Sequence, residues 1–347
     1  MSGTVVLTQR AVRLIGVASG LGVPPDDAAA SVGAADALRH TDLCGAVRRN
    51  GVGCAWDATV ALPATIVERS AALAWLCRQT TEQVVSATTE GALPLVLGGD
   101  HGMAVGTWRG VAQAQGAPLG MLWIDAHLDA HTSDSSLSGN AHGMPLAALL
   151  GAMPTPWPVA SACLDATRVC MLGMRSCEDA ELRLLQRFGV KVIGDDEIQL
   201  RGLPQALADA LAYVGRGGGA FGVSIDLDVI DPHDAPGVNT PCSGGLQGAA
   251  LVAELRGLGR HPQLAGLEIA EYNPEHDRDG RTAALVAALV ESLLAPDAAA
   301  CQALEARHGA HNYAPLPVVL ARLTALRHRS PSNSPSSMTA LIGSLQR

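Results

Sequence analysis

A chain of 347 residues that is 48% hydrophobic can bury a substantial core, as one large α/β domain or as two smaller ones. Its formal net charge of −9 and the lack of a basic block argue against nucleic acid as a partner. Its longest apolar runs fall short of the roughly 18 residues that a membrane span needs. The first residues show no signal-peptide pattern. The eight cysteines form no CxxC pair, so we expect a protein of the reducing cytoplasm.

Hydrophobic periodicity divides most of the chain into alternating strands and helices. The predicted strands span residues 12–17, 93–97, 119–124, 168–174, 190–193, 220–225 and 264–270. The predicted helices span residues 28–38, 65–87, 103–115, 145–150, 178–188, 203–214, 247–257 and 281–294. Residues 40–60 show no clear period. Strands that alternate with helices predict an α/β fold with a doubly wound, mostly parallel sheet.

The end of the chain has a different character. No strand pattern continues beyond residue 297, and the stretch from Arg329 to Ser337 is rich in serine and proline. Such low-complexity sequence is typical of disorder. We therefore predict one folded domain over residues 1–296 and a partly disordered C-terminal extension over residues 297–347.

Potential metal ligands follow the predicted strand at residues 119–124. Asp125, His127 and Asp129 alternate with apolar residues. Alternate residues of an extended backbone point the same way, so these three side chains are expected to converge. Carboxylate oxygen and neutral imidazole suit a divalent ion such as manganese, nickel, cobalt or zinc.

Two further groups of ligands follow other strands. Asp226 and Asp228 come after the strand at residues 220–225, and His101 ends a Gly-Gly-Asp-His turn after another strand. Open α/β sheets place their sites at this carboxyl edge. Together the groups supply four aspartates and two histidines, enough to hold two ions if two carboxylates bridge, and two-metal sites activate a shared water.

Four blocks in chain order resemble the ureohydrolase family of arginase and agmatinase. These blocks are GGDH at 98–101, DAHLDAH at 125–131, SIDLDVIDP at 224–232 and EYNP at 271–274. The resemblance extends over about residues 12–295, and residues 138–151 are more similar to arginase than to agmatinase. It implies a three-layer arginase-like fold, two divalent ions (manganese or nickel) and a trimer or hexamer, of one chain type or mixed. It implies hydrolysis of a small guanidino compound to urea and an amine, with arginine as the default substrate.

The resemblance also implies the roles of individual residues. One metal ion would be bound by His101 and Asp129, the second by His127 and Asp228, and both by the bridging Asp125 and Asp226. The implied catalytic residues are His142, Glu271 and Asp129. His142 would protonate the leaving amine, and Glu271 would pair with the planar guanidinium. Glu268, on the other face of the same strand, is expected to be structural.

The substrate-binding residues that the resemblance implies are Glu271, His131, Ser138, Glu178 and Thr240. Two of them depart from the usual arginase pattern, because His131 stands where Asn is usual and Glu178 where Asp is usual. Asn239 also stands where Gly is common. His131 could be solvated, could contact the substrate or could be a further metal ligand. Glu178 could instead be an acid at a helix N-terminus, which the helix dipole favours.

Two other functions fit these observations. The substitutions at His131 and Glu178 would suit a small or substituted guanidine such as guanidine, guanidinobutyrate or metformin. A non-catalytic subunit of a mixed oligomer is the second alternative, although the complete ligand set argues against it. The segment from Leu304 to Arg322 resembles the start of ornithine aminotransferases, which suggests an arginine-catabolic ancestry.

Overall fold

The computed structural model describes residues 10–153, 157 and 161–296. Eight strands form one sheet: β1 (Val12–Ala18), β2 (Cys54–Ala61), β3 (Leu93–Gly98), β4 (Leu119–Ile124), β5 (Leu164–Met174), β6 (Lys191–Gly194), β7 (Phe221–Asp226) and β8 (Leu264–Ala270). Their order in the sheet is β2-β1-β3-β8-β7-β4-β5-β6, and each pair of neighbouring strands is parallel. The predicted parallel sheet is therefore confirmed.

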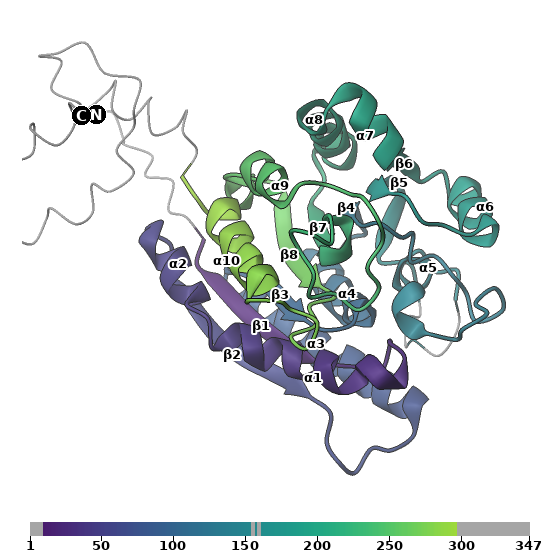
Figure 1. Ribbon diagram of the computed structural model, residues 1–347, viewed down its shortest axis with the longest axis horizontal. Helices are drawn as coiled ribbons and strands as arrows, with labels where there is room; N and C mark the ends of the chain where they lie inside the picture. Colours follow the sequence, from purple (N-terminus) through teal and green to yellow (C-terminus); the bar gives the residue numbers. More distant parts are fainter. Residues whose placement is uncertain (1–9, 154–156, 158–160, 297–347) are drawn as a thin grey trace, which may run out of the picture. The chain divides into compact units, whose positions relative to one another are not determined.

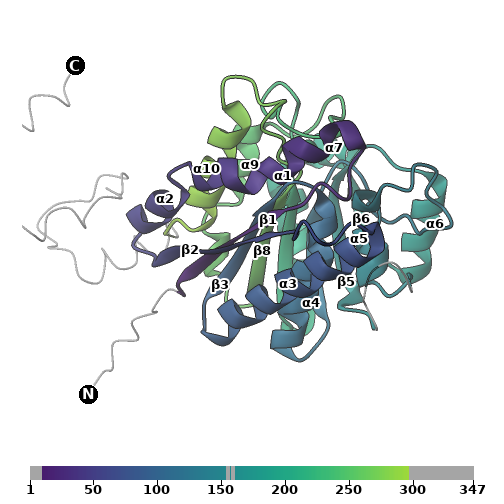
Figure 2. The ribbon, with the colours of Figure 1, turned by 90° about the horizontal axis from the view of Figure 1, so that it is seen from below.

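Helices cover both faces of the sheet (Figures 1 and 2). One face carries α1 (Pro25–Arg39), α2 (Leu43–Arg49), α7 (Asp195–Arg201), α8 (Leu203–Val214), α9 (Gly248–Glu254) and α10 (Arg281–Leu293). The other face carries α3 (Arg69–Thr89), α4 (Ala104–Gln115), α5 (Pro145–Leu149) and α6 (Asp179–Phe188). Each face has its own hydrophobic core, so the fold has three layers, as the family resemblance implied.

The order of the strands explains why distant parts of the sequence meet. β3, β8, β7 and β4 are consecutive neighbours in the sheet, and every residue of these four strands is buried. A strand covered on both faces needs mostly apolar side chains, which is why these strands were recognisable as apolar runs. Because the strands are parallel, the residues that follow them come together at one edge of the sheet.

The sequence-based prediction missed three short elements. α2 lies within residues 40–60, β2 begins there and ends at Ala61, and α7 precedes the predicted helix at 203–214. The predicted start of α1 at residue 28 is also wrong, because Pro25 begins the helix at a position that proline favours. The predicted domain boundary stays a prediction, since residues 297–347 lie outside the described residues. Within residues 10–153 and 161–296, every helix is too short or too polar to cross a lipid bilayer.

Candidate metal centre

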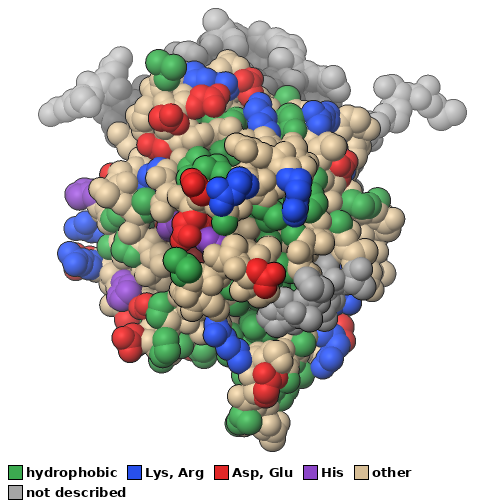
Figure 3. Space-filling view, turned by 90° about the vertical axis from the view of Figure 1, so that its right-hand side faces the viewer, with side chains coloured by type: hydrophobic (Ala, Val, Ile, Leu, Met, Phe, Trp, Pro, Cys, Tyr) green, Lys and Arg blue, Asp and Glu red, His purple; other side chains and the backbone are tan. Residues whose placement is uncertain are grey.

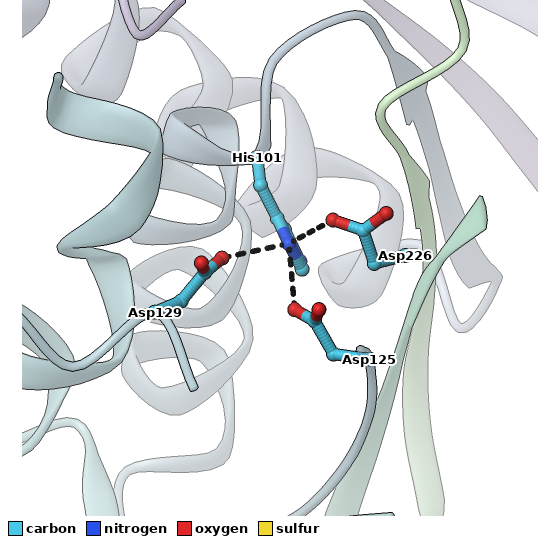
Figure 4. A group of neighbouring side chains, drawn as sticks. All are labelled: His101, Asp125, Asp129 and Asp226. Atoms are coloured by element: carbon cyan, nitrogen blue, oxygen red, sulfur yellow. Dashed lines mark ion pairs between the residues drawn. The ribbon is translucent and has the colours of Figure 1, made fainter. Parts of the chain in front are cut away.

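Four buried side chains converge at or just beyond the carboxyl ends of β3, β4 and β7 (Figure 4). The Nδ1 atom of His101 lies 3.4 Å from Asp125, 3.0 Å from Asp129 and 2.9 Å from Asp226, in each case from Oδ2. Among the described residues, neither His101 Nδ1 nor Asp129 Oδ2 has a hydrogen-bond partner. An imidazole nitrogen and three carboxylate oxygens that face one another in this way fit a divalent cation between them.

A second group of potential ligands adjoins the first. One ligand atom each of Asp125, His127 and Asp228 lie within 4.8 Å of one another. The Nδ1 atom of His127 is 2.9 Å from Asp228 Oδ2 and 3.8 Å from Asp125 Oδ1. Asp125 thus belongs to both groups, while Asp226 belongs to the first alone. The bridging role of Asp226 stays a prediction.

Tight turns, and not an extended backbone, bring these ligands together. β4 ends at Ile124, and Asp129 has a left-handed backbone with φ of 48°. The expected extended alternation beyond that strand is therefore wrong. Instead, Asp125 Oδ1 accepts a hydrogen bond from the N–H of His127 at 2.7 Å, and Asp226 Oδ1 accepts one from Asp228 at 2.8 Å. Aspartate favours such turns because its side chain can satisfy the backbone two residues on.

Burial and mutual repulsion raise the pKa values of two of these carboxylates. Burial and then the charges of Asp228 and Asp125 raise the pKa of Asp226 well above its usual range. Burial and the charge of Asp125 raise the pKa of Asp129 to about 7. Carboxylates that resist ionisation in this way are stabilised by a nearby cation. The electrostatics therefore agree with the donor set in favouring a metal centre.

A hydrogen-bonded chain behind His101 was missed by the sequence analysis. The Nε2 atom of His101 lies 2.9 Å from Ser224 Oγ, and Ser224 donates to Glu268 Oε1 at 2.8 Å. Because the hydroxyl proton faces Glu268, Nε2 of His101 is the donor to Ser224. The Nδ1 lone pair then faces the three aspartates. The available signal was an acid inside the otherwise apolar strand β8, where Glu268 is fully buried.

We expect Ser224→Ala and Glu268→Gln each to weaken manganese binding by about 10- to 100-fold, because such outer contacts orient the ligand and raise its basicity. Isothermal titration calorimetry of the metal-free proteins would measure this change. Ser292→Ala is the matched control, because that buried serine bonds to the Val252 carbonyl, far along the chain from His101. Unchanged affinity in both variants would contradict the orienting role.

A cavity of about 370 Å³ opens over the two ligand groups. Five of the predicted site residues outside the metal ligands line it: His131, Ser138, His142, Glu178 and Thr240. The residues around it include five acids, and among these described lining residues there is no Lys or Arg. Figure 3 shows carboxylate and histidine side chains together near the middle of one face.

Outside the metal ligands, Glu271 is the one predicted site residue that does not line this cavity. It is 1% exposed, and its Oε1 lies 3.2 Å from Nδ1 of His142. Burial lowers the pKa of His142, but the charge and hydrogen bond of Glu271 outweigh burial and raise it to about 9. In this geometry Glu271 contacts His142 of the cavity wall, and its pairing with a guanidinium stays a prediction.

His131 lies between two acids at the wall of the cavity. Its Nε2 is 3.5 Å from Glu181 Oε2 and 3.6 Å from Glu178 Oε1. It belongs to neither ligand group found among the described residues. Glu178 is the N-cap of α6, which confirms the interpretation as an acid at a helix N-terminus. It also lines the cavity, and its contact with the substrate stays a prediction. Thr240 donates to Asp228 Oδ2 at 3.3 Å.

Comparisons with known proteins agree with this geometry. Residues 21–295 match the model of the arginase family. The arginase of Brevibacillus brevis is 40% identical over 208 residues, which are 59% of this chain and 70% of that protein. The crystal structure of the Bacillus cereus arginase has a TM-score of 0.76 at 31% identity, covering 83% of this chain and 99% of that one. The Bacillus caldovelox arginase structure has a TM-score of 0.77 at 29% identity, with 83% and 99% covered. The chain therefore belongs to the arginase family.

Proposed function

We propose that this protein is a metal-dependent hydrolase that cleaves the guanidino group of L-arginine to urea and ornithine. Membership of the arginase family and relatives that bear the name arginase support this activity. The observation that carries the proposal is the pair of ligand groups joined by Asp125, which lie beneath a cavity whose wall includes His142.

The donor set of imidazole and carboxylate supports two divalent ions, for which we propose manganese or nickel. His101 and Asp129 would hold one ion, His127 and Asp228 the other, with Asp125 and Asp226 shared. Bound there, the ions supply the Lewis acidity that makes a water nucleophilic near neutral pH. Asp129 lines the cavity, so the carboxylate oxygen that would not bind the ion is placed to accept a hydrogen bond from that water.

His142 and Glu271 would complete the reaction. The activated water attacks the planar guanidinium carbon and gives a tetrahedral centre. The C–N bond between this carbon and the rest of the arginine side chain then breaks. The amine must leave protonated, and an imidazolium in the cavity wall can supply that proton. The Glu271 carboxylate favours the protonated form of His142, and by the family resemblance it also orients the guanidinium.

The outer part of the cavity favours arginine over the alternative substrates. Glu178 and Glu181 line it, and carboxylates of this kind suit the α-ammonium group of an amino acid. His131 and Ser138 offer hydrogen-bond donors for its carboxylate. Guanidinobutyrate has a carboxylate but no α-ammonium group, so it would place a negative charge near Glu178 and Glu181 without a compensating positive one. Guanidine and metformin have no α-ammonium group to pair with these acids.

The experiment is to measure urea release after loading the purified protein separately with manganese and with nickel. The substrates are arginine, agmatine, guanidinobutyrate, guanidine and metformin. We expect arginine to give the highest kcat/KM, and Asp226→Asn to lower it by more than about a hundredfold, since changes outside the ligands alone cost 10- to 100-fold. A small guanidine as the best substrate would overturn arginine as the substrate. No urea from any compound, with metal bound, would favour a non-catalytic subunit.

We also propose a trimer or hexamer located in the cytoplasm, which the family resemblance and the composition support. Light scattering after size-exclusion chromatography would measure the oligomer size. A monomer at micromolar concentration would contradict the first part of this proposal.

A further inference from the structure

A buried chain of side-chain hydrogen bonds ends on Glu271. The Nδ2 atom of Asn239 donates to Glu271 Oε2 at 2.6 Å. The Oδ1 atom of the same amide accepts a hydrogen bond from Ser31 Oγ at 3.1 Å and another from Asn273 Nδ2 at 2.9 Å. All four residues are at most 7% exposed, so water does not compete for these bonds.

The direction of each bond in this chain follows from the next. Asn273 Oδ1 accepts the backbone N–H groups of Glu275 at 2.9 Å and His276 at 3.3 Å. The amide nitrogen of Asn273 must therefore face Asn239, so Asn239 must present its amide oxygen to Asn273. The amide nitrogen of Asn239 is then left for Glu271. Side-chain amides are ambiguous when taken alone, and here the network removes the ambiguity.

The backbone places Asn239 opposite Glu271. Val238 and Tyr272 pair as an antiparallel bridge, and the N–H of Asn273 donates to the carbonyl of Gly237 at 2.9 Å. In this antiparallel register the residue after Val238 faces the residue before Tyr272, so Asn239 lies opposite Glu271. Ser31 adds a link from α1, which is separated from Asn239 by 208 positions in the sequence.

Asn239 closes the set of donors around the Glu271 carboxylate. The other oxygen, Oε1, accepts the backbone N–H of His101 at 2.6 Å and faces His142 at 3.2 Å. Because each oxygen accepts at least one hydrogen bond, the Glu271 carboxylate cannot rotate freely about its Cγ–Cδ bond. Hydrogen bonds to an ionised carboxylate are also among the stronger ones in proteins.

We propose that Asn239 is a positioning residue, which holds the Glu271 carboxylate in the orientation that receives the guanidino group of the substrate. This inference rests on the proposed function, because it takes Glu271 as the partner of that group. It assigns a role to a side chain that the sequence analysis noted only as a departure from the usual residue.

The test compares Asn239→Asp and Asn239→Ala with the wild-type protein. Asn239→Asp keeps the oxygen that Ser31 and Asn273 require but lacks the donor to Glu271. Asn239→Ala removes the donor without adding a charge. In both, we expect KM for arginine and the inhibition constant of guanidinium ion to rise by about tenfold or more, since a hydrogen bond to a charged group is lost. Ornithine, which lacks the guanidino group, should inhibit as in the wild-type protein.

Ser31→Ala is the matched control, because it removes a buried hydrogen bond to Asn239 and leaves the amide bonded to Glu271. The guanidinium inhibition constant of this variant should stay within about twofold of the wild-type value. The proposal is overturned if guanidinium inhibition is unchanged in both Asn239 variants, or if ornithine inhibition weakens to the same extent. If the wild-type protein releases no urea, the proposed function fails, and calorimetric binding of guanidinium to the metal-loaded proteins still tests Asn239.

Discussion

Chelation of the metal ions is expected to abolish urea release and to lower Tm at pH 8 by about 5–10 °C. A ligand present at about 100 times its Kd stabilises the folded state by about 2.7 kcal/mol, and each kcal/mol shifts Tm by about 2–4 °C in a domain of this size. The physical cause is the set of buried aspartates around His101, whose negative charges lose their counterions. Differential scanning fluorimetry with and without a chelator measures the shift.

The decrease in Tm that chelation causes is expected to become smaller as the pH falls from 8 to 5. In the metal-free protein the pKa of Asp129 is about 7, above its unfolded value, so the folded state takes up a proton as the pH falls through 7. This uptake stabilises the metal-free protein, and it also weakens metal binding, because ligands must be deprotonated. Equal Tm values with and without chelator at pH 8, together with retained urea release, would contradict a structural and catalytic metal centre.

The sequence predicted the interior of the fold more accurately than its margins. β3, β4, β7 and β8 are buried on both faces, so each had to be a run of apolar residues with a clear beginning and end. β2 lies at the edge of the sheet, and most of its residues are partly exposed. An edge strand of this kind has no apolar run to recognise.

The metal ligands were predictable for a related reason. Because parallel strands end at a common edge, polar residues directly after apolar runs were expected to meet, and His101 does meet Asp125 and Asp226. The local geometry was not predictable from the same pattern, since the left-handed backbone at Asp129 replaces the expected extended one.

The contacts that support the site could not be predicted, although the acid inside β8 marked Glu268 as structural. Glu268 reaches His101 through Ser224, and Asn239 reaches Glu271 with help from Ser31. These contacts join segments that lie 32 to 208 positions apart, and they depend on the register between strands and loops. No spacing within one segment carries that information.

Replacing His142 with glutamine is expected to lower kcat for arginine by about 100- to 10,000-fold, the range that general acid catalysis contributes. Glutamine can still form a hydrogen bond with Glu271, but it cannot give a proton to the leaving amine. His142 belongs to neither ligand group in the described residues, so the metal content should be unchanged. Steady-state kinetics of urea release, with metal analysis of the same samples, measures both quantities.

The pH dependence separates an acid from a merely structural histidine. The Glu271 carboxylate raises the pKa of His142 to about 9 against the effect of burial, so the imidazolium is present below that pH and is lost above it. The wild-type rate should therefore fall as the pH rises through about 9, and this decline should be absent in His142→Gln. Added imidazole should restore part of the activity of the variant. His233→Gln serves as the control, since the side chain of His233 is 84% exposed and does not line the cavity. A His142→Gln protein that keeps the wild-type kcat and the same decline would show that another group donates the proton.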